Sequence, residues 1–138
     1  MNVRRRDAED AEIIEENELS GKVIGAAVEV HKHLGPGLLE GVYRDCLVHE
    51  LKTRQLDVEC EKSLPVRYKG LEFEAAYRAD LVVEKTLIVE LKAVDRLLAI
   101  HTAQLLSYLR MSGLKLGLLI NFNTPKLVEG VKRVVNNF

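Results

Sequence analysis

The stretch that decides the fold runs from Leu71 to Lys92 and reads LEFEAAYRADLVVEKTLIVELK. Between Leu71 and Val83 every odd residue is apolar, while most even residues are polar or charged. This period of two predicts a long strand with one face in the core. After Glu84 and Lys85 comes the apolar run 87–89, which is typical of a central strand. We therefore expect the two strands to adjoin in one sheet.

The same alternation begins before this stretch. Leu64, Val66 and Tyr68 are spaced two apart, and Lys69-Gly70 separates them from the long strand. A glycine there supplies the positive φ angle that a tight hairpin turn needs. The residues around 64–83 are therefore predicted to form a hairpin.

Two helices are predicted ahead of the hairpin. The first covers about residues 15–34, because apolar residues recur at helical spacing up to Leu34, and Gly35-Pro36-Gly37 ends it. The second runs from about Leu38 to Arg54. Its buried side is expected to carry Leu39, Tyr43, Cys46, Leu47 and Leu51.

The remaining elements follow the central strand. A third helix is predicted over about Asp95 to Ser112, and 114–122 is predicted to be a buried strand parallel to its predecessor. Pro125 fits the first turn of a short last helix, with 131–135 as a closing strand. The fold class is therefore α/β, with a mixed sheet of four to five strands flanked by helices.

Composition is that of one ordinary globular domain. Of 138 residues, 47% are hydrophobic and 30% charged, and no apolar run approaches the roughly 18 residues that span a bilayer. We expect an acidic arm or helix extension at 1–18, a single domain at 19–138, no membrane partner and a cytoplasmic location. The two cysteines, Cys46 and Cys60, lie in no metal-ligand pattern and are expected to be reduced.

Charge is unevenly distributed along the chain. The formal net charge is -1, but residues 1–20 hold seven acidic and three basic groups. The remainder has 17 basic and 14 acidic residues, or about +3. This balance is compatible with a nucleic-acid partner without requiring one.

The strongest chemical signal is formed by Asp80, Glu90 and Lys92 on the two adjoining strands. Because side chains alternate along a strand, Glu90 and Lys92 share one face, about 7 Å apart. Unpaired charges on a central strand cost several kcal/mol, so a cation or a salt-bridge network must compensate them. On this pattern alone, a structural ion pair is as well supported as a Mg²⁺ site.

The E-x-K triplet is weak without its strand. Glu50-Leu51-Lys52 has the same letters, but it falls in a predicted helix, where residues i and i+2 do not face each other. In the strand, Asp80, Glu90 and the Leu91 carbonyl are positioned to hold a metal that activates water, and Lys92 to orient that water.

Residues 37–43, GLLEGVY, resemble the signature of the GxxExxY proteins, a branch of the PD-(D/E)xK nuclease superfamily. The likeness covers about Leu19 to Asn123 and includes the D-x9-ExK pattern and a Gln-x3-Tyr pair at Gln104 and Tyr108. It implies a restriction-endonuclease-like core of three antiparallel strands and a parallel one. It also implies hydrolysis of DNA or RNA with Mg²⁺ or Mn²⁺.

The same resemblance extends the candidate site. Glu40 would approach the metal from the second helix as a further metal ligand and catalytic residue, Gln104 would join the catalytic group, and Tyr108 and His101 would contact substrate. From residues alone, a carboxylate at Glu40 is equally explained by the helix dipole, and the His101, Gln104 and Tyr108 stripe by a solvated or packing face.

Two other functions stay open. The scaffold could bind nucleic acid or protein without catalysis, or the charged cluster could be purely structural. An enzyme of this size that cuts both strands of a duplex is expected to act as a homodimer.

Overall fold

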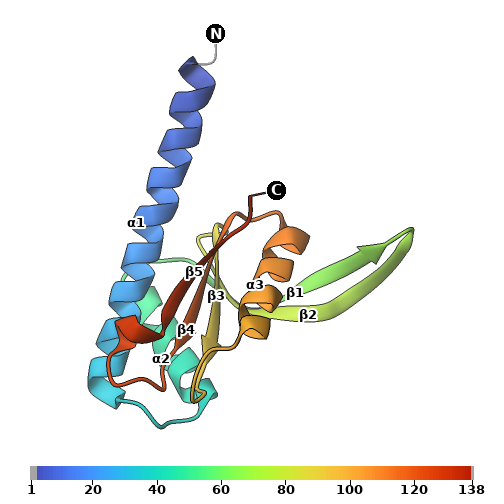
Figure 1. Cartoon of the computed structure of the whole chain (residues 1–138). Coiled ribbons are helices and arrows are strands. Elements are labelled where there is room, and N and C mark those ends of the chain that lie inside the picture. Colours follow the sequence, from blue (N-terminus) through green and yellow to red (C-terminus); the bar gives the residue numbers. More distant parts are fainter. Residues whose placement is uncertain (1–2, 138) are drawn as a thin grey trace.

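The computed structural model describes residues 3–137, with side chains described for 16–74 and 77–137. It contains one five-stranded sheet with helices on both faces (Figure 1). In chain order, the elements are α1 (Val3–Leu34), α2 (Glu40–Thr53), β1 (Val58–Tyr68), β2 (Leu71–Val83), β3 (Leu87–Lys92), α3 (Ala99–Ser112), β4 (Leu116–Asn121), the 3-10 helix η1 (Leu127–Gly130) and β5 (Val131–Val135).

The sheet order is β1-β2-β3-β4-β5. Strands β1, β2 and β3 are antiparallel neighbours, β4 is parallel to β3, and β5 is antiparallel to β4. Lys69 and Gly70 form the hairpin turn, both with positive φ angles of 44° and 87°. The predicted mixed sheet, its hairpin and its parallel central pair are therefore confirmed.

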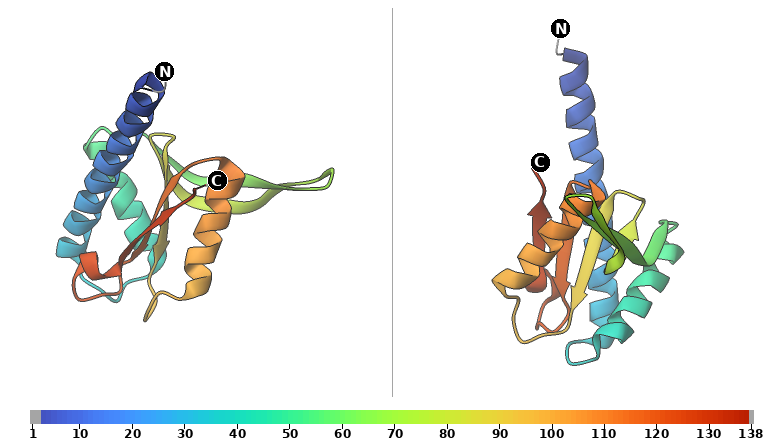
Figure 2. Two further views of the ribbon diagram at one scale, coloured as in Figure 1. Left: turned by 45° about the horizontal axis from the view of Figure 1, so that its top comes forward. Right: turned by 90° about the vertical axis from the view of Figure 1, so that its right-hand side faces the viewer.

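Two apolar cores lie on opposite faces of the sheet. One is built from α1, α2 and the inward residues of the central strands, with Tyr43, Leu47 and Leu51 fully buried. The other lies under α3, where Leu105 and Leu109 pack on β3 and β4 (Figure 2). A Cβ at Gly117 would lie within 3.0 Å of Leu105, so glycine there lets α3 pack closely. Both faces of β3 and β4 are covered.

The prediction that β2 keeps one apolar face in the core along its whole length was wrong. The outer hairpin projects beyond the body (Figures 1 and 2), and Leu71, Phe73 and Tyr77 are 59%, 53% and 49% exposed. Nearer the body, Ala79 joins the core under α3, whereas Leu81 joins the core under α1 and α2. The apolar stripe therefore changes sheet face close to residue 80. Ala75 lies outside the residues whose side chains are described.

Helix boundaries differ from expectation at several ends. α1 begins at Val3 rather than near residue 15, although the side chains of 1–15, most of the acidic arm, lie outside the described residues. α2 begins at Glu40 and leaves Leu39, expected on its buried side, 80% exposed; Cys46 is only partly buried.

Two predicted helix starts near the carboxyl end were also displaced. α3 begins at Ala99 instead of Asp95, because the backbone of Val94 is bonded to the side chain of Asn121. The last helix is the single 3-10 turn η1, and it begins after Pro125 because Lys126 is extended. No helix in the described part of the chain is long and apolar enough to cross a membrane.

Candidate metal centre

The candidate site lies where β2 leaves β3. The ladder between these strands ends with the pair Leu81 and Val89. At the next position the Asp80 amide donates to Glu90 Oε1 at 2.9 Å, and the Leu91 amide donates to Asp80 Oδ2 at 2.8 Å. The two carboxylates thus replace the backbone acceptors that a continuing strand pair would have supplied. This exchange of bonds holds Asp80 and Glu90 together.

A local distortion explains why the strands separate here. Asp80 is also missing from the ladder between β1 and β2, which skips from the pair Cys60 and Leu81 to Lys62 and Ala79. Opposite it, Glu61 has a φ of 50°, unusual for a residue with a side chain. Asp80 is therefore a break in the sheet on both sides, at the point where the apolar stripe changes face.

Glu90 is the buried member of the pair, with 7% of its surface exposed. Burial, and after it the charge of Asp80, raises the pKa of Glu90 to about 8, while the bond from the Asp80 amide and the charge of Lys92 oppose this shift. A buried carboxylate beside a second one is costly unless a positive charge lies close. The pair therefore favours binding of a cation.

Lys92 lies two residues after Glu90 on the same strand, and its positive charge acts on the carboxylate of Glu90. Its charge lowers the pKa of both Glu90 and Glu40. Yet among the described residues no ion pair within 4.0 Å joins Lys92 to Asp80 or Glu90. The direct salt bridge that the structural alternative required is thus absent between these described side chains.

The Leu91 carbonyl points toward the same place. Peptide groups alternate between the two neighbouring strands, and the Lys92 carbonyl accepts the Phe122 amide at 2.9 Å on the β4 side. The amide of Leu91 is directed to the β2 side, toward Asp80, so its carbonyl is directed there as well. A backbone oxygen therefore adjoins the carboxylates.

Glu40 is the first residue of α2. Its carboxylate interacts electrostatically with Asp80 and Lys92 but does not take part in the hydrogen bonds that join Asp80 and Glu90. Burial, then Asp80, raises the pKa of Glu40, while Lys92 and Arg44 lower it. Arg44, one turn along α2, lies 3.7 Å from Glu61 on the distorted part of β1. Arg44 was not among the predicted site residues; its position one turn after Glu40 is the only signal of it in the sequence.

The 37–43 signature has a physical role in placing Glu40. Tyr43 is fully buried and stacks on Phe122 with ring centroids 4.6 Å apart. Its hydroxyl donates to the Gly35 carbonyl at 2.5 Å and accepts the Leu38 amide at 3.1 Å. These bonds fix the loop between α1 and α2, and with it the first turn of α2.

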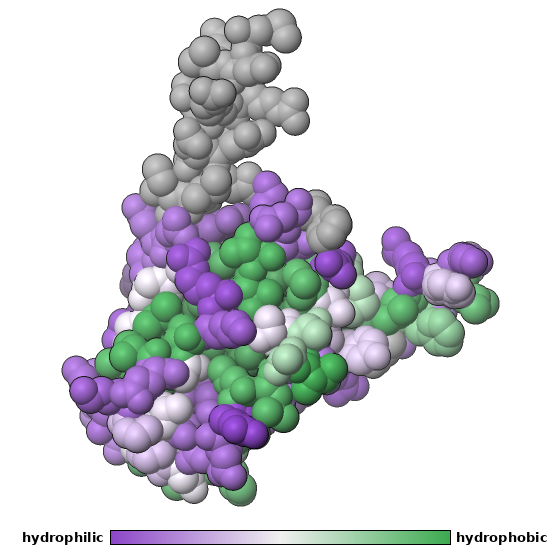
Figure 3. Space-filling model, viewed as in Figure 1, coloured by the Kyte–Doolittle hydropathy of each residue, from purple (hydrophilic) through white to green (hydrophobic). Residues whose placement is uncertain are grey.

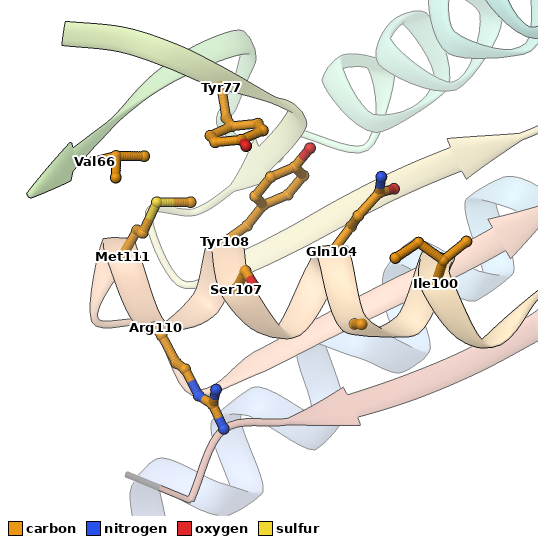
Figure 4. A pocket seen from close by; sticks show the side chains of 9 residues that line it. Val66, Tyr77, Ile100, Gln104, Ser107, Tyr108, Arg110 and Met111 are labelled. Carbon is orange, nitrogen blue, oxygen red and sulfur yellow. The ribbon is translucent and has the colours of Figure 1, made fainter. Parts of the chain in front are cut away.

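The predicted residues of α3 separate into two groups. Tyr108 packs against the apolar cluster that contains Ala79, the neighbour of Asp80, and burial, followed by the charges of Glu90 and Asp80, raises its pKa. Gln104 is exposed and lines a pocket with Tyr108 and Tyr77 (Figure 4). His101 instead accepts the Leu98 amide at 3.0 Å through Nδ1, a bond that caps the start of α3. Its expected contact with substrate stays a prediction.

Asn121 is a positioning residue that the sequence reasoning missed. It is 2% exposed, and its side chain accepts the Val94 amide at 3.1 Å and donates to the Val94 carbonyl at 2.9 Å. These bonds hold the chain directly after Lys92. The one signal in the sequence was an asparagine inside the otherwise apolar run 116–122.

The number and kind of the ligand atoms at the site determine which ion fits it. Within the described residues, no three histidine, cysteine, aspartate or glutamate side chains gather closely enough to hold a metal. Asp80 and Glu90 are thus a two-carboxylate set with a backbone oxygen beside them. Mg²⁺ commonly takes one or two carboxylates and keeps several waters, whereas Ca²⁺ and structural Zn²⁺ take more protein ligands. The set fits Mg²⁺, or Mn²⁺ with similar ligands.

Comparison with known proteins supports the class that this geometry defines. The family model of the PD-(D/E)XK nuclease superfamily matches residues 17–134. The protein therefore belongs to the PD-(D/E)XK nuclease superfamily, whose members typically use divalent metals and act on nucleic acid. No curated protein and no solved structure matches the chain.

Proposed function

We propose that this protein is a Mg²⁺-dependent nuclease that hydrolyses phosphodiester bonds of DNA or RNA, with Mn²⁺ able to replace Mg²⁺. The observation that carries the proposal is the buried Glu90 beside Asp80, with no lysine or arginine among the described side chains in an ion pair with either carboxylate. Superfamily membership supplies the class of reaction. Asp80, Glu90 and the Leu91 carbonyl are the proposed metal ligands.

The chain's own residues have separate tasks in this proposal. Asp80, Glu90 and the Leu91 carbonyl would hold a divalent ion, which would supply a water of lowered pKa and positive charge beside the phosphate. Lys92 orients the attacking water and stabilises the negative charge that develops on the phosphate oxygens. Glu40, and Gln104 from α3, complete the polar rim that positions this water, while Tyr108 and His101 contact the substrate.

We also propose that the chain belongs to the GxxExxY branch. In support, each fixed letter of the signature has a local role: Gly37 adopts a φ of 96°, Glu40 begins α2, and Tyr43 bonds the loop ahead of it. The cytoplasmic location and the homodimer expected from the sequence stay predictions.

The test compares matched aspartate variants. Purified protein is incubated with single- and double-stranded DNA and RNA in Mg²⁺, Mn²⁺ or EDTA. Asp80→Asn keeps an oxygen to accept the Leu91 amide but removes the charge, so cleavage should be lost while the fold is kept. Asp57→Asn, an exposed aspartate distant in sequence from the pair, should cleave as the parent does. Equal activity in the two variants, or no cleavage of any substrate by the parent, would refute the proposal.

One observation favours a second candidate, a catalytically silent nucleic-acid-binding or protein-binding module. Among the described residues, no group of three histidine, cysteine, aspartate or glutamate side chains could hold a metal, so any ion would depend on two carboxylates and a backbone oxygen. Nucleic-acid binding that survives Lys92→Ala, with no turnover on any substrate, would support this candidate instead.

A further inference from the structure

The pocket between the hairpin and α3 adjoins the carboxylate pair but does not contain it. It has a volume of about 580 Å³, within the roughly 300–1,000 Å³ typical of ligand sites. Tyr77 from β2 and Tyr108 from α3 form its wall, with ring centroids 5.7 Å apart and planes inclined at 46° (Figure 4). Tyr77 precedes Asp80 by three residues on β2, and Tyr108 packs against the apolar cluster that contains Ala79, so the pocket opens beside the proposed site of cleavage.

The wall of this pocket combines flat apolar rings with a free hydrogen-bonding edge. Tyr77 is 49% exposed although its ring is large, and Gln104 is exposed at the same opening. A glutamine amide can both donate and accept hydrogen bonds, as the edge of a nucleobase does. Aromatic rings bind bases through their faces, with little regard to sequence.

Two further hollows continue from the pocket along the hairpin and the end of α3. Successive hollows share Met111, and the second also shares Arg110 with the first and Pro65 with the third. Every charged residue in the lining of these three hollows is basic. Arg110 lines the first, Arg67 and Arg110 line the second, and Lys62 and Lys85 line the third. No acidic residue lines them among the side chains described.

The two basic residues of β1 that line these hollows, Lys62 and Arg67, form only solvent-exposed ion pairs. Arg110 is among the residues that line the pocket, but its guanidinium is directed away from the tyrosines (Figure 4). Lys62 and Arg67 contact Glu59 and Glu72 in exposed pairs at 3.3 Å. Exposed pairs of this kind are weak, so phosphates can take the place of the glutamates.

We propose that the groove between the β1–β2 hairpin and α3 binds single-stranded nucleic acid, with one unpaired base stacked against Tyr77 and Tyr108. Phosphates of the same strand follow the basic residues along the hairpin. The proposal deepens the proposed nuclease function, on which it rests for the scissile bond. In a duplex the base faces are hidden in the stack, so only an unpaired base can occupy this pocket.

The outer hairpin is suited to extend this contact. Apolar side chains lie on it as well as on the body (Figure 3), and Leu71 and Phe73 stay exposed beyond the pocket. These residues lie on the same strand as Tyr77, nearer to the hairpin turn. The base pocket, however, is defined by Tyr77, which makes this residue the one to test.

Binding is measured apart from cleavage, by fluorescence anisotropy of labelled single-stranded DNA and RNA in EDTA. Tyr77→Ala should weaken binding about 5- to 100-fold, because base stacking on one aromatic ring contributes on that order. Tyr77→Phe should keep the affinity. Tyr68→Ala removes a tyrosine beside the hairpin turn that is 60% exposed, more than Tyr77, and should have a much smaller effect. A single 2-aminopurine in the strand should be quenched by the parent and Tyr77→Phe but not by Tyr77→Ala.

The outcomes separate the two proposals. Three results would overturn the proposal that the groove binds single strands, even if cleavage is found. They are equal binding by the parent and Tyr77→Ala, an equal loss of binding in Tyr68→Ala, and a preference for the matching duplex. If a base stacks in a way that depends on Tyr77 but no substrate is cleaved, the single-strand-binding proposal would be supported and the proposed nuclease activity rejected. Self-association that Tyr77→Ala abolishes, with no oligonucleotide bound, would assign the groove to a second copy of the chain and overturn the proposal.

Discussion

The tripeptide Glu-Leu-Lys occurs twice in this chain, at 50–52 in α2 and at 90–92 in β3. Both leucines are fully buried. In α2, Glu50 pairs with Arg54 at 2.8 Å and Lys52 is exposed to solvent. In β3, Glu90 is buried against Asp80 and Lys92 acts on it electrostatically.

The difference comes from the period of the backbone. A strand returns its side chains to one face after two residues, so the glutamate and lysine of 90–92 act on one spot. A helix places positions i and i+2 on different sides, so those of 50–52 act separately. The sheet on either side of β3 then removes water from Glu90. Identical letters therefore give one surface ion pair and one candidate metal centre.

The largest expected effect follows from neutralising the glutamate in each triplet. Glu90→Gln should lower metal-dependent cleavage on the order of a thousandfold, since metal stabilisation of the transition state contributes several kcal/mol. Glu50→Gln should leave the rate unchanged. Initial rates on one labelled substrate at saturating Mg²⁺ measure this. Comparable losses in both variants would mean that stability, and not metal binding, is being read.

Truncating the lysines should have a somewhat smaller effect. Lys92→Ala should slow cleavage about 100- to 1,000-fold, as expected for loss of one group that stabilises developing charge. Lys52→Ala is the matched exposed control and should be silent. Single-turnover rates at saturating protein separate this effect from substrate binding. A Lys92→Ala enzyme with the parent's rate would remove Lys92 from the proposed mechanism.

Truncating the central leucine should have the same effect in both triplets. Leu51→Ala and Leu91→Ala each leave a cavity in the same apolar core, so each should lower the free energy of unfolding by about 2–5 kcal/mol. Urea denaturation followed by circular dichroism measures both. A loss below about 1 kcal/mol at either site would contradict the burial described for that leucine.

The smallest expected effect is a pH dependence that only one glutamate causes. The pKa of Glu90 rises from an ordinary 4.5 to about 8 on folding, so the folded state holds an extra proton between these values. Its contribution to stability is therefore full below about pH 4.5 and is lost as the pH rises through about 8.

Metal-free protein should accordingly lose on the order of 2 kcal/mol of unfolding free energy between pH 5 and 8 through this group. Glu90→Gln should abolish that part of the slope, and Glu50→Gln should keep it. Urea titrations in EDTA at several pH values give the comparison. The same slope in all three proteins would show that Glu90 does not titrate in this range.

Much of the fold followed from local patterns. Alternation identified the strands, Lys69-Gly70 the turn, and Gly113 the left-handed end of α3, because each depends on the residue's own backbone preference. The grouping of Asp80, Glu90 and Lys92 was likewise inferred from charges within apolar strands. Their roles as ligands and catalyst stay predictions.

The rest depended on neighbours that no local pattern encodes. Alternation predicts that Leu71 and Phe73 share a face, but not that nothing packs on it. The change of face at residue 80 depends on Glu61 in the other strand, and the late start of α3 depends on Asn121, 27 residues from its partner Val94. Such contacts between distant residues decided the details of the site.

Pro65 lies inside β1, the outermost strand of the sheet, where the register with β2 shifts between Leu64 and Val66. A proline has no amide hydrogen to offer, and a bulge twists the strand away from flatness, so a sixth strand cannot be added smoothly across this point. Aggregation by edge-to-edge growth of fibrils is thereby resisted at the most extended part of the protein. The β1–β2 hairpin can therefore remain long, apolar and exposed to solvent without becoming a template for misassembly.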